Sequence, residues 1–411
     1  MSEGIPTRER PRKFALSLYL LGQGTSWLGD SIAPIALVFA IIRFGNAFSV
    51  GTVLASGLVP SVFLTLFGGV IGDRFPKYLV MLVSDFARMA AYAALALITY
   101  KNDNTIWHYA ILYAIAGIGG AFFRPAASSI VPEIVEKAEI QRANATIGVF
   151  RNIAMVLGPL LAGIMIARGG PGLGLATNSF SFLISAISLT ALTLLVPGAL
   201  NSRRTNGGKS VWQELTEGWE AFSSRGWIVS IVFWASLFQF FVIAPFEVLG
   251  PIISKQFYGG AQSWAYVMAA FGAGSIVGAA SIISKKIKFS LSGACVGLIT
   301  FAGLMFGFAM RVTVLELCGL AFLSGSALSI FGVVWATHLQ TLLPREILAR
   351  VNSYDILLSI IFYPLGLALT GFAAQAMGSN HVLISSAIFA VVSPCLIGLA
   401  PAVQKIKTEA V

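Results

Sequence analysis

Charged residues are scarce in this chain: Asp, Glu, Lys and Arg make up only 11% of its 411 residues, whereas 57% are hydrophobic. A soluble protein of this length needs more charge to cover its surface, but a protein whose main solvent is lipid does not. The shortage of charge therefore excludes an ordinary soluble globular protein and favours one that crosses a membrane several times.

Cysteine and histidine are rare as well, with three residues of each type. The cysteines (Cys295, Cys318 and Cys395) fall in hydrophobic stretches far apart in the sequence, which is typical of small apolar packing residues. The histidines (His108, His338 and His381) are scattered and peripheral, so they do not form a metal-binding pattern. Neither a disulfide framework nor a metal site is expected.

A phosphate-binding loop is missing too. The stretch Gly207-Gly208-Lys209-Ser210 resembles the end of such a loop, but the motif needs a glycine at position 203, where the chain has Arg203. No strand pattern precedes it. The sequence therefore predicts a protein that is not an enzyme and that uses no cofactor.

What the chain has instead is long hydrophobic segments. A lipid-spanning helix needs roughly 20 apolar residues, and about twelve segments meet this criterion. Their approximate cores are Phe14–Ile42, Val50–Ile71, Leu79–Tyr100, Ile106–Val131, Ala145–Ala167, Leu175–Val196, Trp227–Leu249, Ser263–Ile283, Leu291–Met310, Val314–Thr337, Asp355–Met377 and Val382–Ala400. They are too long and unbroken for barrel strands, which alternate over about 10 residues. The predicted fold class is an all-α polytopic membrane protein with twelve transmembrane helices.

The net charge of +10 follows from this topology. If successive loops alternate between the two sides of the membrane, most of the 27 Lys and Arg residues fall on the side of the N-terminus. The loops on the other side hold only Arg43, Lys101, Arg168, Lys255 and Arg311. This asymmetry is the positive-inside rule, and it predicts that both termini are cytoplasmic. The basic balance thus indicates membrane insertion, and no nucleic acid is expected as a partner.

One long polar stretch divides the chain nearly in half. The predicted organisation is a cytoplasmic N-terminal tail (1–13), an N-terminal six-helix bundle (14–197), a cytoplasmic linker (198–226), a C-terminal six-helix bundle (227–400) and a cytoplasmic C-terminal tail (401–411). In the linker, Val211, Leu215, Trp219 and Phe222 recur at helical spacing, which predicts an amphipathic helix. This helix could lie on the membrane surface or pack on its neighbours.

The two halves share a short pattern. Arg142-Ala143-Asn144-Ala145 follows the fourth segment, and Arg350-Val351-Asn352-Ser353 follows the tenth. The two patterns are separated by about half the chain. Two halves related by duplication are the internal-repeat pattern of transporters, in which the substrate site lies between the halves near the midplane.

The most specific motif lies between the second and third segments and runs from Gly69 through Asp73 and Arg74 to Lys77. Asp73 is expected at a membrane–water boundary, where it could pair in one conformation and be released in another. An ordinary charged loop is the alternative. The loop resembles the motif of the major facilitator superfamily, with Pro76 in place of the usual glycine. The resemblance implies two pseudo-symmetric six-helix bundles and makes this loop a conformational-switch motif.

Further stretches resemble the macrolide-efflux and enterobactin-exporter-like branch of the drug:proton antiporters in this superfamily. They are Leu28-Gly29-Asp30-Ser31, Phe122-Phe123-Arg124-Pro125-Ala126-Ala127-Ser128, and Leu343-Pro344 through Arg350-Val351-Asn352-Ser353. Gly158, Pro159 and Gly163 resemble the antiporter signature, with Ala162 replacing one of its glycines. A Gly-Pro pair bends a helix and lets a neighbour pack closely. The resemblance covers essentially the whole chain.

Asp30 is the candidate for proton coupling. It falls near the middle of the first segment, where a charged carboxylate facing lipid is costly. A carboxylate enclosed there could take up and release a proton. The alternative is a structural carboxylate held by neighbours such as Ser26 or Ser31.

Other charges fall within or at the ends of the segments. Asp85 and Arg88 are spaced i, i+3 and are expected to pair. Arg124 and Arg151 could gate the cavity with Asp73 or Asp85, or attract an anionic substrate.

Three further acids lie near predicted segment ends. Asp355 could join the cytoplasmic charge network of the motif loop. Glu247 and Glu316 are expected at outer helix ends, in contact with solvent.

In the resembled architecture, the first, fourth, seventh and tenth segments line the substrate cavity. The expected lining residues are Gln23, Trp27, Phe123, Trp234, Phe238, Gln239 and Phe331. Aromatic side chains can hold greasy or cationic molecules. Alternatively, these side chains could face lipid or pack between helices.

Together these patterns predict a secondary active transporter that exports small hydrophobic or amphipathic, drug-like molecules by proton antiport with alternating access. The proton gradient would be its energy source. Its expected partners are a small-molecule substrate, protons and the lipid bilayer, and we expect a monomer in a bacterial inner membrane. A dedicated exporter of a siderophore or another self-made metabolite is the first alternative. A non-transporting membrane receptor or scaffold is the second, and Asp30, Asp73 and the Gly158-Pro159 pair argue against it.

Overall fold

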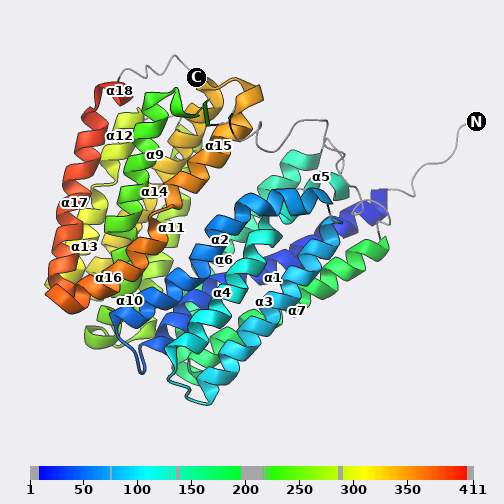
Figure 1. The fold of residues 1–411 in the computed structure, drawn as a ribbon, viewed down its shortest axis with the longest axis horizontal. Helices are drawn as coiled ribbons and strands as arrows, with labels where there is room; N and C mark the ends of the chain where they lie inside the picture. The colour runs from blue at the N-terminus through cyan, green and yellow to red at the C-terminus, as the bar shows by residue number, and fades with distance from the viewer. Residues whose placement is uncertain are drawn as a thin grey trace, which may run out of the picture. The chain divides into compact units, whose positions relative to one another are not determined.

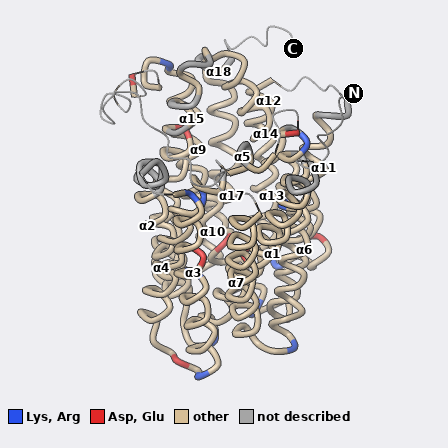
Figure 2. Tube along the Cα trace, turned by 90° about the vertical axis from the view of Figure 1, so that its right-hand side faces the viewer, with Lys and Arg blue, Asp and Glu red and all other residues tan. Residues whose placement is uncertain are grey.

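The computed structural model describes residues 9–74, 76–128, 130–135, 139–195, 216, 219–220, 222–285 and 290–404. Within these ranges the chain is helical and contains no β-strand. Twelve helical stretches are long and apolar enough to cross a membrane, and they match the predicted segments in order and approximate position. Figure 2 shows that charge is absent from most of their length. The predicted all-α polytopic fold is confirmed.

The chain divides into two compact units. The N-terminal unit comprises Met1–Phe44 and Ser56–Asn206, and the C-terminal unit comprises Gly45–Ala55 and Gly207–Val411. The division after Asn206 falls within the predicted linker, most of which lies outside the described residues.

The helices of the N-terminal unit are the more regular ones (Figure 1). They are α1 (Glu9–Ile41), α2 (Ala47–Arg74, which enters this unit at Ser56), α3 (Lys77–Tyr100), α4 (Ile106–Ser128), α5 (Val131–Ile134), α6 (Ile140–Gly169) and α7 (Pro171–Leu195). Helix α7 packs along both α1 and α3, α3 packs along α4, and α1 packs along α6. Residues on α1, α3 and α7 can therefore meet in the interior of this unit.

The helices of the C-terminal unit are more often interrupted. They are α9 (Gly226–Phe238), the π-helix η3 (Gln239–Ile243), α10 (Ala244–Phe257), α11 (Ala261–Lys285), α12 (Leu291–Gly297), α13 (Thr300–Met310), α14 (Val314–Leu342), α15 (Arg345–Ile360), α16 (Tyr363–Met377), α17 (Ser379–Leu399) and α18 (Pro401–Gln404). Helix α11 packs along α14, and α13 packs along α14 and α17.

Two of these interruptions have prolines as their cause. A proline lacks the N–H that would bond to the carbonyl four residues earlier, and its ring clashes with that carbonyl. Pro245 accounts for the π-helical turn at Gln239–Ile243, and Pro364 for the break between α15 and α16. Next to the second break, Ser236 Oγ donates to the Leu358 carbonyl (2.7 Å) and Gln239 Nε2 to the Ser359 carbonyl (3.3 Å). Side chains of α9 and η3 thus satisfy carbonyls of α15.

Equivalent glycines allow close helix crossings in the two units. A Cβ atom on Gly117 of α4 would lie 2.0 Å from the Gly57 carbonyl oxygen of α2, and one on Gly325 of α14 would lie 2.1 Å from the Phe271 carbonyl oxygen of α11. Gly117 and Gly325 are separated in sequence by the same distance as Asn144 and Asn352. The α2/α4 and α11/α14 crossings therefore support the duplication that the sequence pattern predicts.

The described end of the linker packs on its neighbours. Phe222 is buried and its ring lies 5.9 Å from that of Trp219 and 6.1 Å from that of Tyr354 on α15. These contacts favour the packed alternative for the amphipathic segment over the membrane-surface one. Val211 and Leu215 lie outside the described residues.

Candidate functional site

The N-terminal unit encloses a cavity of about 830 Å³ between α1, α2, α3, α4, α5 and α6. Of the predicted lining residues, Gln23, Trp27 and Phe123 contribute to its wall. The charged residues on the wall are Asp30, Arg88, Arg124 and Arg151. The structure thus gathers into one cavity residues that lie as far apart in the sequence as Gln23 and Arg151.

Asp85, behind this wall, and Arg88, on it, form the ion pair that their spacing predicts. Arg88 Nη2 donates to Asp85 Oδ1, and the Asp85 side chain is fully buried. The other carboxylate oxygen of Asp85 accepts a hydrogen bond from Ser185 Oγ (2.7 Å), which in turn accepts one from Gln23 Nε2 (3.3 Å). Asp85 is therefore held by α3 and α7 at once, as a buried charge must be if it is to persist in an apolar interior.

Asp30 approaches the same guanidinium from the other side. Its Oδ2 lies 3.9 Å from Arg88 Nη1, and its Oδ1 lies 3.5 Å from Asn178 Nδ2 on α7. The Asp30 side chain is 45% exposed, whereas that of Asp85 is not exposed at all. Of the two carboxylates, Asp30 is thus the one that is open to the cavity.

The Arg88 guanidinium is also fixed by aromatic rings. It lies 4.1 Å from the ring centroids of both Phe123 and Phe182. Aromatic faces attract cations, most strongly where water is excluded. This clamp holds Arg88 between its two carboxylate partners.

Arg124 and Arg151 complete the charge of the cavity. Both side chains are exposed on its wall. Arg151 lies over the Trp27 ring at 5.3 Å, and Arg124 interacts electrostatically with Asp30. Neither arginine forms an ion pair with Asp85, whose partner is Arg88, and the side chain of Asp73, the other partner predicted for them, lies outside the described residues.

The antiporter-like stretch on α6 packs against the first helix beside Asp30. A Cβ atom on Gly158 would lie 2.3 Å from Cβ of Ser31. Glycine is therefore required for the approach of α6 to α1, and Pro159 follows it inside α6. Gly163, one turn further along, is buried.

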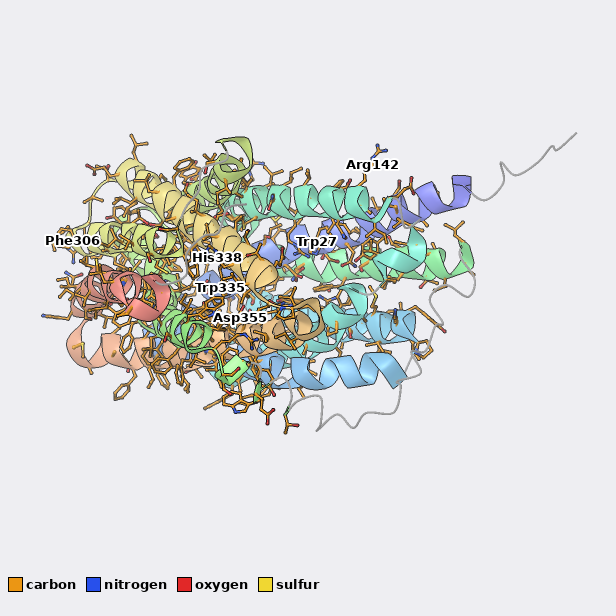
Figure 3. All side chains as sticks on the ribbon, turned by 90° about the horizontal axis from the view of Figure 1, so that it is seen from above. Trp27, Arg142, Phe306, Trp335, His338 and Asp355 are labelled. Atoms are coloured by element: carbon orange, nitrogen blue, oxygen red, sulfur yellow. The ribbon has the colours of Figure 1, made fainter. Side chains whose placement is uncertain are left out.

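The C-terminal unit has a second cavity, of about 400 Å³, between α9, η3, α14 and α15. The remaining predicted lining residues all lie on its wall: Trp234, Phe238, Gln239 and Phe331. Trp335 and Asp355 also line it, and Figure 3 labels both, together with His338 one turn along α14.

Asp355 lies among hydrogen-bond donors on the wall of this cavity. Its Oδ2 accepts a hydrogen bond from Trp335 Nε1 (2.9 Å) and its Oδ1 one from Ser359 Oγ (3.2 Å). Its partners are thus neutral donors of α14 and α15. The predicted link between Asp355 and the motif loop stays a prediction, because the side chains of Asp73 and Arg74 lie outside the described residues.

The motif loop itself is only partly described. Gly69, Asp73 and Arg74 lie at the end of α2, where the side chains are outside the described residues, and Lys77 begins α3. Across the described ranges, no group of three or more His, Cys, Asp or Glu side chains could hold a metal ion.

Sequence reasoning missed three polar residues that complete the two sites: Asn178, Ser185 and Trp335. Asn178 and Ser185 are fully buried on α7. An amide within a hydrophobic segment is a signal that could have been used, because such residues are costly in lipid and face the bundle interior. Serine and tryptophan are common in membrane helices, so Ser185 and Trp335 carry no such signal.

Comparisons with known proteins agree with the family that the sequence resembles. The family model of the Major Facilitator Superfamily matches residues 19–355. Macrolide efflux protein A of Streptococcus pyogenes is 22% identical and aligns over 97% of this chain and 98% of its own length. Multidrug efflux pump Tap of Mycobacterium tuberculosis is 24% identical, with 88% and 87% covered.

Solved structures agree on the fold. The nucleoside transporter NupG has a TM-score of 0.74 at 14% identity, with 94% of this chain and 98% of that chain covered. A bacterial homologue of the iron transporter ferroportin, in an inward-facing state, has a TM-score of 0.72 at 15% identity, with 94% and 99% covered. All these proteins are transporters, which confirms the prediction that the chain is not an enzyme.

Proposed function

Because the chain belongs to the major facilitator superfamily, we propose that it is a secondary active transporter that exports small hydrophobic or amphipathic molecules by proton antiport. The chain is an integral multi-pass membrane protein with twelve candidate spans. Its relatives include a macrolide efflux protein and a multidrug efflux pump, which supports the direction of transport and the broad class of substrate.

The observation that carries the proton-coupled part of this proposal is the sharing of Arg88 by two carboxylates. Asp85 is closer and fully buried, whereas Asp30 is 3.9 Å away and reaches the cavity. When Asp30 takes up a proton, Arg88 keeps Asp85 as its partner, so no buried cation is left without a counter-charge. Asp30 can therefore change its charge while the rest of the group stays paired.

The orientation, location, oligomeric state and transport cycle that we propose rest on the distribution of charge and on the family. The excess of Lys and Arg in alternate loops supports cytoplasmic termini. A bacterial inner membrane and a monomeric state match the resemblance to drug:proton antiporters. In alternating access, Asp30 would bind a proton in the outward-facing state and release it in the inward-facing state, where substrate binds.

The test is the accumulation of a fluorescent lipophilic dye in cells that express the chain, with and without a proton uncoupler. We expect lower accumulation in expressing cells, reversed by the uncoupler and by Asp30→Asn. Asp103→Asn is the matched control, because it makes the same substitution in a loop between α3 and α4, and it should retain full efflux. Membrane insertion of each variant is checked by its yield in the membrane fraction.

Full proton-driven efflux by Asp30→Asn would contradict the role of Asp30. If the wild-type chain does not lower the accumulation of any dye tested, broad export is contradicted. The dedicated exporter of a self-made metabolite would then be tested with the products of biosynthetic genes that neighbour its gene.

A further inference from the structure

The cavity of the C-terminal unit is lined mainly by hydrophobic side chains and by one charged residue. Four aromatic side chains line it, from Trp234 and Phe238 on α9 to Phe331 and Trp335 on α14. Asp355 is its one charged lining residue. A carboxylate in such surroundings is costly unless a cation or hydrogen-bond donors compensate it.

The described residues compensate Asp355 only in part. Trp335 Nε1 and Ser359 Oγ each donate one hydrogen bond, and each carboxylate oxygen can accept a second. Within the described part of the chain, no Lys, Arg or His side chain lies within ion-pair distance of Asp355. The carboxylate of Asp355 is therefore available to a cation that enters the cavity.

The aromatic rings are arranged in contact around this charge. The Trp234 ring lies 5.7 Å from both the Phe238 and Phe331 rings, edge-on to the latter at 82°. Aromatic faces attract ammonium groups and give apolar contact to the hydrocarbon part of the same molecule. The rings and the carboxylate of Asp355 thus line the same space.

We propose that this cavity binds the ammonium group of an amphipathic amine. Asp355 forms the ion pair with the ammonium group, and the four rings contact the apolar body of the molecule. The proposal rests on the efflux function proposed above, and it assigns that function an amine-bearing class of substrate.

The cavity of the N-terminal unit is a poor site for the same cation. Arg124 and Arg151 lie on its wall, and within the described residues neither forms an ion pair with a carboxylate. Asp30 and Asp85 already share Arg88. An ammonium group there would meet uncompensated positive charge, so the two cavities select opposite charges.

Binding of three probes to the purified full-length protein tests this assignment. The probes are 4-phenylbutylammonium, 4-phenylbutan-1-ol and 4-phenylbutanoate, which share one apolar body and differ in the charge of the head group. Isothermal titration calorimetry measures the three dissociation constants. We expect the cation to bind about tenfold more tightly than the alcohol, and the anion to bind more weakly than either.

Asp355→Asn should bring the cation and the alcohol to within about twofold of each other, because the Asn side chain keeps an acceptor but loses the charge. Asp103→Asn, in the loop between α3 and α4, is the matched control and should keep the tenfold preference. The ratio of two dissociation constants does not depend on the fraction of protein that is folded, so partial misfolding of a variant does not hide the result.

An unchanged ratio in Asp355→Asn would overturn the assignment, and so would a wild-type protein that does not prefer the cation. If Asp30→Asn abolishes the preference and Asp355→Asn does not, the cation binds in the N-terminal cavity, which also overturns it. These outcomes are independent of transport, so the amine site can fail while Asp30→Asn still abolishes proton-driven dye efflux.

Discussion

The cavities of the two units use charge in opposite ways. In the N-terminal unit, Asp30 and Asp85 share one guanidinium, and further arginines line a space of about 830 Å³. In the C-terminal unit, one carboxylate lies among aromatic rings in a space of about 400 Å³, and its partners are neutral. Charges that compensate one another stabilise a site from within, whereas a carboxylate with only neutral donors stays available to an incoming cation.

This difference predicts how each site responds to the loss of one member. In the N-terminal site, loss of the shared guanidinium leaves two carboxylates without a cation. In the C-terminal site, loss of one donor removes a single hydrogen bond, and the packing of the aromatic rings around the cavity is kept. The stability of the N-terminal unit should therefore depend on its charges far more strongly.

The largest effect is expected for Arg88→Met, which keeps much of the side-chain volume between Phe123 and Phe182 but removes the charge. Breaking a buried ion pair by removing one partner costs about 3–5 kcal/mol. Thermal unfolding of the purified protein in detergent should show this loss. The double variant Arg88→Met/Asp85→Asn should recover part of it, because it also removes the fully buried uncompensated carboxylate. A single variant as stable as the wild type would contradict the compensated-charge account.

A smaller effect is expected for Trp335→Phe, which keeps a ring on the wall but removes the N–H that donates to Asp355. Hydrogen bonds to charged groups contribute about 1.5–3 kcal/mol. Trp227→Phe is the matched control, since the Trp227 ring contacts Trp335 at 5.6 Å without donating to a carboxylate. Equal losses of thermal stability in the two variants would show that the indole–carboxylate bond does not stabilise the unit.

The same contrast explains what the sequence could predict. The spans were predictable because every backbone polar group in lipid must be bonded within its own helix, which demands long apolar segments. The Asp85–Arg88 pair was predictable because an i, i+3 spacing on one helix is local. The lining residues were predictable because the family resemblance indicates which helices face a cavity.

Contacts between helices could not be predicted from spacing. Asp30 meets Arg88 and Asn178 only because α1, α3 and α7 pack together. Asp355 meets Trp335 only because α14 and α15 pack together. In each case the partner lies on another helix, and its choice depends on packing rather than on sequence distance.

Glu247 shows the same limit at a helix end. It was expected in solvent at an outer end, but the span continues through η3 and α10 to Phe257. Glu247 therefore lies inside the span, where Tyr363 Oη donates to its Oε2. Glu316, by contrast, caps the start of α14 with Thr313, as its position predicts.

The glycine crossings test whether the two units, so different in charge, are alike in packing. Gly117→Ala and Gly325→Ala each place a Cβ atom about 2 Å from a backbone carbonyl oxygen. Overpacking of this kind costs about 1–3 kcal/mol, and we expect similar losses of thermal stability from both. Gly120→Ala on α4 and Gly319→Ala on α14 are the matched controls, because no described atom lies within 4 Å of the added Cβ. A loss in only one unit would contradict the equivalence of the two crossings.

The smallest effect is expected outside the spans, at Asp103 in the loop between α3 and α4. Hydrogen bonds from His108 and from the Thr105 backbone lower the pKa of the Asp103 carboxyl. A lowered pKa means that the stabilisation is present above the unfolded pKa, about 3.9, and is lost as the pH falls through the folded value. Asp103→Asn should therefore melt slightly below the wild type at pH 7, and this difference should shrink as the pH is lowered below about 3.9.

The size of that difference sharpens the comparison between the sites. Asp103 and its His108 partner are open to solvent, where ion pairs contribute little because water and salt screen them. If Asp103→Asn loses as much thermal stability at pH 7 as Arg88→Met does, burial is not the reason why the charges of the N-terminal site stabilise their unit. The loss of thermal stability in Asp103→Asn should shrink in 1 M salt, whereas the loss in Arg88→Met should not. That outcome would mean that the N-terminal site is stabilised by the buried guanidinium that Asp30 and Asp85 share.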